Sequence, residues 1–114
     1  MKQLLGILIL AMASAALVTG TVKAADTPPV VKVDIYNYKF DPETVTVSVG
    51  TTIVWTNKDE IPHTVASSDK SFPGSPGLDT GDSYSYTFTK AGSYEYYCTL
   101  HPFMKGKVIV TSKD

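Results

Sequence analysis

From residue 30 onward, the chain shows short runs in which apolar and polar side chains alternate with a period of two. Val31, Val33 and Ile35 share one parity in the first run, and three valines do so in the run 44–49. Successive side chains of a β-strand point to opposite faces, so this alternation predicts strands. The expected strands lie at 30–35, 44–49, 52–57, 63–67, 84–88, 93–98 and 107–112.

Turn-forming residues separate these runs, and no stretch has a convincing helical period. The segment 41–43 (DPE) predicts a turn, and the segment 67–83, rich in Gly, Pro, Ser and Asp, predicts a long surface connection. Seven or eight short strands divided by turns are typical of an antiparallel β-sandwich or barrel. We therefore expect a single all-β domain.

The N-terminal segment carries a different pattern. A charged start precedes an apolar run over 4–18, and small residues follow it, as in a secretory signal peptide. A membrane-spanning helix needs about 18 apolar residues or more, and this run is shorter, so an uncleaved anchor is the less favoured alternative. We expect a signal peptide over 1–25, cleaved between Ala24 and Asp26, and one exported, periplasmic domain over 26–114.

The charge of the expected mature chain argues against a nucleic-acid partner. The sequence has ten basic residues, all of them Lys, and eleven Asp and Glu, and the signal peptide removes Lys2 and Lys23. The remaining net charge is about −3, whereas nucleic-acid-binding domains carry a basic patch. Exported domains of this size often depend on disulfides, but one cysteine, Cys98, cannot form an internal disulfide. Cys98 therefore needs another role.

The scarce sulfur and imidazole side chains of the chain are concentrated in one segment, 96–104 (YYCTLHPFM). Cys98, His101 and Met104 follow one another at intervals of three residues. Beyond the expected signal peptide, Met104 is the single Met, and the one other His is His63. Cys98 shares the parity of two tyrosines in its strand, so its thiol is expected at the strand end on an aromatic face. The loop that follows can bring the other two side chains over the same point.

One thiolate, two imidazoles and one weakly bound thioether form the ligand set of a copper electron-transfer site. Thiolate and thioether suit Cu(I), and imidazole suits both oxidation states. A structural zinc site requires a fourth Cys or His ligand, and iron–sulfur clusters and attached haem require more cysteines. Oxygen-reducing multicopper centres require more histidines than the two present. We therefore expect one copper ion per chain.

Two other interpretations explain less of the pattern. A Cys–His nucleophilic pair would use Cys98 with either histidine, but it leaves the spacing of Met104 unexplained and places the nucleophile on an inward-facing strand end. Alternatively, Cys98 and Met104 are ordinary core residues and both histidines lie on the surface. That interpretation requires four scarce side chains to converge by chance. We therefore expect a metal site rather than an enzyme.

The segments 98–104 (CTLHPFM) and 55–65 (WTNKDEIPHTV) resemble the ligand-bearing segments of the type 1 blue copper proteins, or cupredoxins. Two residues in each gap between Cys, His and Met are typical of the amicyanin group, whereas plastocyanin and pseudoazurin have longer His-to-Met gaps. The resemblance covers nearly the whole expected mature chain. It departs at Leu100, where amicyanins typically have proline.

The resemblance implies a Greek-key β-sandwich of about eight strands with copper bound at one end. The implied copper ligands are His63, Cys98, His101 and Met104. The resemblance also implies that Asn57 connects the two ligand segments through hydrogen bonds near Thr99 and the thiolate. Contacts of this kind tune a metal site.

In this family the loop histidine reaches an apolar surface patch, and such patches often mark docking surfaces. The expected patch residues are Ile61, Pro62, Leu100, Pro102 and Phe103. Phe103 is expected to be exposed, whereas Leu100 could face either the patch or the core. The charged residues nearby are expected to form a polar rim or to be ordinary solvated charges. They are Asp59, Glu60, Lys105 and Lys107.

The expected function is that of an exported, monomeric electron carrier that shuttles one electron through Cu(I) and Cu(II), without catalytic activity and without membrane contact. The resemblance to amicyanin implies an amine dehydrogenase as donor and a c-type cytochrome as acceptor. The alternative is a periplasmic copper chaperone or storage protein, which would offer an open or Met-rich site selective for Cu(I). A single Met, and a Cys at a strand end, favour the closed redox site.

Overall fold

The computed structural model describes residues 27–112, which form eight strands and no helix. The expected signal peptide over 1–25 lies outside the described residues. The strands are β1 (Val30–Ile35), β2 (Phe40–Asp41), β3 (Thr44–Ser48), β4 (Thr51–Asn57), β5 (Ala66–Ser67), β6 (Ser83–Phe88), β7 (Gly92–Tyr97) and β8 (Lys105–Thr111). The all-β prediction is confirmed.

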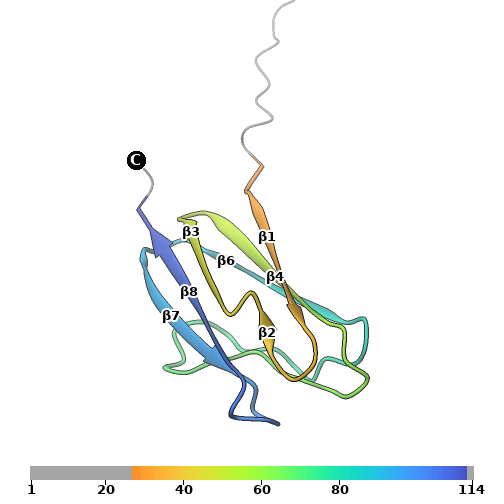
Figure 1. The fold of residues 1–114 in the computed structure, drawn as a ribbon. Helices are drawn as coiled ribbons and strands as arrows, with labels where there is room; N and C mark the ends of the chain where they lie inside the picture. Colours follow the sequence, from red (N-terminus) through yellow and green to blue (C-terminus); the bar gives the residue numbers. More distant parts are fainter. Residues whose placement is uncertain (1–26, 113–114) are drawn as a thin grey trace, which may run out of the picture.

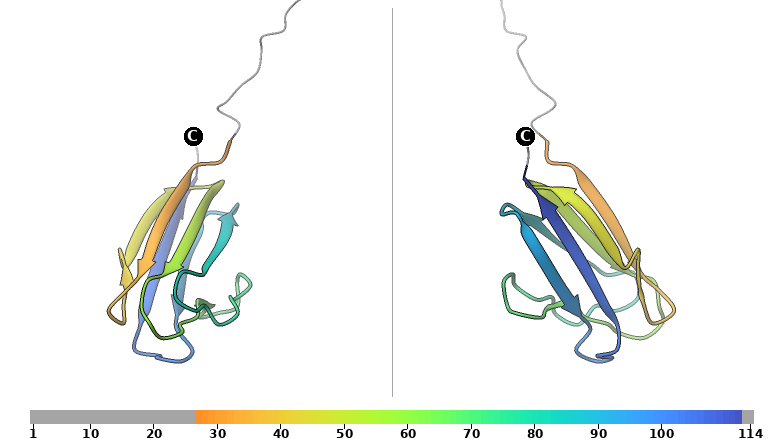
Figure 2. Two further views of the ribbon diagram at one scale, coloured as in Figure 1. Left: turned by 90° about the vertical axis from the view of Figure 1, so that its right-hand side faces the viewer. Right: turned by 60° about the vertical axis from the view of Figure 1, so that its left-hand side comes forward.

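The strands form two four-stranded sheets that pack face to face (Figures 1 and 2). One sheet has the order β2-β1-β4-β6 and the other the order β3-β8-β7-β5. The β1–β4 and β3–β8 pairs are parallel and the remaining pairs are antiparallel. The sandwich prediction is therefore correct, but the two parallel pairs, which alternation cannot reveal, make both sheets mixed.

The period-two pattern explains the core between the sheets. Along β4, every second residue from Thr51 to Asn57 is buried, and Trp55 has no exposed surface. The side chains of Val33 and Ile35 in β1 are likewise fully buried. Burial of these apolar side chains is the main driving force for pairing the sheets.

Two predicted segments differ from the structure. The expected strand at 63–67 is reduced to β5, while β2 was not predicted because it is only two residues long. The segment 67–83 is not wholly superficial, since Phe72 and Leu78 are 5% and 3% exposed. Phe72 stacks on Trp55 with ring centroids 6.2 Å apart, so this connection closes one side of the core.

The loops that carry the scarce ligand residues lie together at one end of the sandwich. They are the β4–β5 connection with His63 and the β7–β8 loop with Cys98, His101 and Met104. The tight β1–β2 turn lies at the same end, whereas β1 begins and β8 ends at the opposite one (Figure 1). The sheet topology thus brings segments about 35 residues apart in sequence into contact.

Candidate metal centre

Cys98 directly follows β7 and is completely buried. Its backbone N–H donates to the carbonyl of Met104 at 3.1 Å, and the N–H of Met104 donates to the carbonyl of His101 at 2.9 Å. These two bonds close a tight loop between β7 and β8. The spacing of three residues in the sequence therefore corresponds to one compact turn that holds the expected ligands over the strand end.

His63 lies on the connection between β4 and β5, which joins the two sheets, and is also completely buried. Its backbone pairs with Leu78 in both directions, at 3.1 and 2.8 Å, which fixes the loop that carries it. The Nδ1 atom of His63 lies 3.7 Å from the Sγ atom of Cys98, and the Nδ1 atom of His101 lies 3.8 Å from the same sulfur. The three donor atoms lie within 4.8 Å of one another.

The carboxylate of Asp59 sets the tautomer of His63. The Nε2–H of His63 donates to Oδ2 of Asp59 at 2.8 Å, which leaves the Nδ1 lone pair facing Cys98. Burial alone would raise the pKa of Asp59, but the N–H donors of Tyr38 and Asn37, together with His63, outweigh burial and hold this pKa below its usual range.

The expectation that Asp59 is a solvated or rim charge is therefore wrong. Asp59 is only 8% exposed because its carboxylate accepts hydrogen bonds from the β1–β2 turn and from His63. Its position four residues before His63 is the one sequence feature that could have indicated this contact. The turn that supplies the other donors lies more than twenty residues upstream, so its contribution was not visible in the sequence.

The contact expected between Asn57 and Thr99 is not among the hydrogen bonds of residues 27–112. The side-chain amide of Asn57 instead donates to the carbonyls of Ile61 and Leu78, at 2.9 and 2.8 Å, and its Oδ1 accepts the N–H of Asp59 at 2.9 Å. These bonds hold the Asn57 side chain within its own loop. Asn57 therefore shapes the segment that carries the first histidine rather than connecting the two ligand loops.

Thr64, which the sequence analysis did not single out, makes the connection between the loops. Its backbone N–H donates to Sγ of Cys98 at 3.4 Å, and its hydroxyl oxygen accepts the N–H of Thr99 at 2.8 Å. The hydroxyl groups of Thr64 and Thr99 lie 2.9 Å apart. The sequence signal was the position of Thr64 next to a ligand histidine, which makes its backbone a neighbour of the same site.

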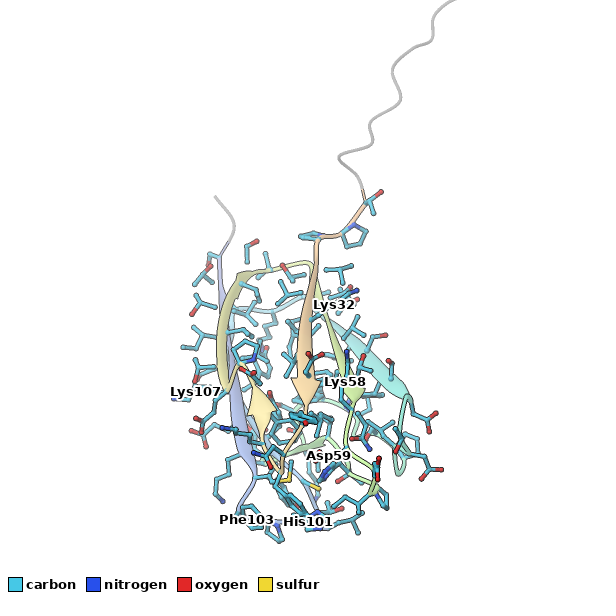
Figure 3. The ribbon with its side chains drawn as sticks, turned by 45° about the vertical axis from the view of Figure 1, so that its right-hand side comes forward. Lys32, Lys58, Asp59, His101, Phe103 and Lys107 are labelled. Carbon is cyan, nitrogen blue, oxygen red and sulfur yellow. The ribbon has the colours of Figure 1, made fainter. Side chains whose placement is uncertain are left out.

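The apolar residues expected around His101 are largely exposed. Leu100 and Phe103 are 52% and 68% exposed, so Leu100 does not fold into the core. Pro62 and Pro102 are exposed, and Ile61 and His101 are half-buried. Figure 3 shows His101 and Phe103 together at the loop end of the molecule, and their ring centroids lie 6.3 Å apart. Met104, in contrast, is 2% exposed and belongs to the core cluster with Cys98.

The donor atoms fit a single metal ion. An ion about 2.3 Å from a thiolate and about 2.0 Å from an imidazole nitrogen, in a trigonal arrangement, separates the two donors by about 3.7 Å. The two Sγ–Nδ1 distances, 3.7 and 3.8 Å, match this separation. One thiolate with two imidazoles in a buried site is the donor chemistry that suits copper.

Comparison with known proteins agrees with this geometry. A family model described as a cupredoxin-like domain matches residues 5–110. Amicyanin-alpha of Methylorubrum extorquens is 40% identical over 106 residues, which cover 86% of this chain and 87% of that protein. Amicyanin of Paracoccus denitrificans is 41% identical over 83 residues, or 68% of this chain and 63% of the relative.

Solved structures give the same result. A Cu(I) form of an amicyanin variant superposes with a TM-score of 0.68 at 39% identity, covering 71% of this chain and 81% of that one. A purple cupredoxin from Nitrosopumilus maritimus superposes with a TM-score of 0.66 at 33% identity, covering 71% of this chain and 99% of that one. The chain therefore belongs to the cupredoxin family of blue copper proteins.

Proposed function

We propose that this protein carries single electrons between redox proteins through one copper ion held by His63, Cys98, His101 and Met104. The observation that supports this function is the convergence of one thiol and two imidazole nitrogens within 4.8 Å at the end of a β-sandwich. Copper supplies a one-electron couple between Cu(I) and Cu(II) when it is bound. Met104, buried on the same short loop, would supply a fourth, weakly bound thioether ligand.

The protein's contribution is to keep the ligands in place. The Asp59 carboxylate orients the ring of His63, and the N–H of Thr64 points at the sulfur of Cys98. Both ligand loops are attached to paired strands, so they resist displacement when the charge of the site changes. A site that moves little on electron transfer loses little energy to rearrangement, which favours fast transfer.

The proposed route for electrons is the face around the half-buried His101. The docking residues are Ile61, Pro62, Leu100, Pro102 and Phe103. The exposure of Leu100 and Phe103 supports an apolar patch beside the metal ligand. Redox complexes commonly bury less than about 1,200 Å², because turnover requires rapid dissociation.

The partners are proposed by analogy with the amicyanin relatives. The proposed donor is an amine dehydrogenase and the proposed acceptor is a c-type cytochrome; the carrier itself is monomeric and has no catalytic activity. The proposed location is the periplasm, after removal of residues 1–25. Within residues 27–112, no helix has the length and apolar character required to cross a membrane.

Addition of Cu(II) to the purified domain, with visible and paramagnetic resonance spectra, tests this function. The expected result is an intense thiolate charge-transfer band in the wild type that is absent in the Cys98→Ser variant. A pale, tetragonal copper signal would contradict the proposal. Tight binding of Cu(I), without a charge-transfer band after oxidation, would instead indicate a copper chaperone or storage protein.

A further inference from the structure

The two histidines of the metal centre are held in different ways. The ring of His63 is fixed by the hydrogen bond from its Nε2 to Asp59 at 2.8 Å. His101 lies on an exposed loop, and across residues 27–112 no hydrogen bond involves its Nε2 atom. Its Nδ1 atom has one polar neighbour among these residues, the Sγ atom of Cys98 at 3.8 Å. Without a polar anchor, the orientation of the His101 ring depends on packing.

Tyr38, in the β1–β2 turn, supplies part of that packing, beside the rings of His63 and Phe103, whose centroids lie 5.0 and 6.3 Å from that of His101. Its ring meets the His101 ring edge to face, with centroids 5.1 Å apart and an interplanar angle of 83°. The same ring meets His63 at 5.7 Å and 85°, and it stacks with Phe103 at 6.4 Å and 21°. Edge-to-face contacts of this kind stabilise ring pairs beyond the burial of area. Tyr38 therefore contacts both histidine rings and the most exposed aromatic ring of the docking face.

The backbone of Tyr38 adopts a conformation that a bulky residue rarely takes. Asn37 and Tyr38 have φ values of 57° and 61°, in the left-handed region that favours glycine. The turn is closed by backbone hydrogen bonds between Tyr36 and Lys39, and the Asp59 carboxylate accepts both central N–H groups, at 2.7 and 3.1 Å. Strained residues that are held by their surroundings often lie at functional sites.

We propose that Tyr38 is a positioning residue that keeps the His101 ring directed toward Cys98. Asp59 is then the common anchor of the two histidines. It holds His63 directly and holds His101 through the turn that presents Tyr38. This inference rests on the proposed function in one respect, namely that His101 is a metal ligand.

Three variants separate this role from a structural one. Tyr38→Gly removes the ring while relieving the left-handed backbone, so part of the lost contact energy is offset and the variant is expected to remain folded. Tyr38→Phe keeps every ring contact and removes the hydroxyl. Tyr36→Ala is the matched control, because Tyr36 is 60% exposed on the same hairpin and has no aromatic ring contact within the described residues.

The first measurement uses the copper-free protein, in which NMR relaxation of the His101 ring is recorded at one fixed pH. The expected result is greater ring motion in Tyr38→Gly, with Tyr38→Phe and Tyr36→Ala resembling the wild type. The second measurement is the rate at which a chelator removes copper from the loaded protein. Loss of the ring contacts is expected to increase that rate about tenfold in Tyr38→Gly.

Equal His101 motion in Tyr38→Gly and Tyr36→Ala would overturn the inference. A Tyr38→Phe variant that behaves like Tyr38→Gly would also overturn it, because the hydroxyl and not the ring would then be responsible. If the wild type binds copper without a thiolate charge-transfer band, the proposed function fails, yet the copper-free measurement still decides the role of Tyr38.

Discussion

The two loops that bear the expected ligands are built differently. The β7–β8 loop carries Cys98, His101 and Met104 within seven residues and is closed by its own backbone hydrogen bonds. The sequence therefore shows this set of candidate ligands directly. The loop around His63 is held by Asn57, by the bridge to Leu78 and by a turn of another strand pair. The comparison suggests that a short loop can provide the ligands, while long-range hydrogen bonds provide their orientation.

The largest effect is expected from removing the carboxylate that serves both histidines. In Asp59→Ala, the donors of Asn37, Tyr38 and His63 lose their acceptor together. The expected loss is about 3 kcal/mol in the free energy of unfolding of the copper-free protein, since each buried unsatisfied donor costs about 1–3 kcal/mol. Urea unfolding measures this loss. Glu60→Ala, at the exposed neighbouring position, is the control and should change stability by less than about 0.5 kcal/mol.

A smaller loss is expected from cutting the connection between the loops. Thr64→Val preserves shape but removes the hydroxyl oxygen that accepts the Thr99 N–H. The expected cost is about 1–2 kcal/mol, because that donor loses its partner near the buried sulfur. Thr46→Val, on β3, removes an exposed hydroxyl that makes no hydrogen bond within residues 27–112, and it serves as the comparison. Equal unfolding free energies for the two variants would argue against Thr64 as the link.

The thioether can be tested with little effect on the core. Met104→Leu conserves volume at a buried position, so its cost should stay below about 1.5 kcal/mol. The expected variant retains copper but has a shifted reduction potential, because an axial ligand tunes the site rather than anchoring it. Voltammetry of the copper-loaded protein measures the shift. Complete loss of copper would show that Met104 is a principal ligand instead.

The smallest effect on stability is expected at the docking face. Phe103 is mostly exposed, so Phe103→Ala should change the unfolding free energy by less than about 0.5 kcal/mol. Electron self-exchange, which requires two copies to meet at their transfer faces, should slow by about tenfold. NMR line broadening in mixtures of oxidised and reduced protein measures this rate. Val30→Ala, exposed at the opposite end of the sandwich, should leave the rate unchanged.

The sequence predicted the features that depend on local alternation of side chains and on the small number of Cys and His residues. Alternation located most strands because one face of each is buried, and the small inventory of Cys and His indicated the three side chains that the structure brings together. It could not indicate the parallel pairing of β1 with β4 or the burial of Phe72, which depend on how the sheets meet. Tyr38 was missed because its contacts join segments more than twenty residues apart, and Asp59 was assigned to the rim although it lies only four residues before His63.

The separation of the two ends of the sandwich has a practical consequence. Because β1 begins and β8 finishes away from the ligand loops, a tether joined near Val30 or beyond Thr111 leaves the face around His101 unobstructed (Figure 1). The domain could thus be fixed to an electrode or fused to an enzyme with the half-buried His101 at its free end. Because the chain ends lie opposite the ligand loops, the domain could also be joined to other redox domains in a designed electron-transfer chain.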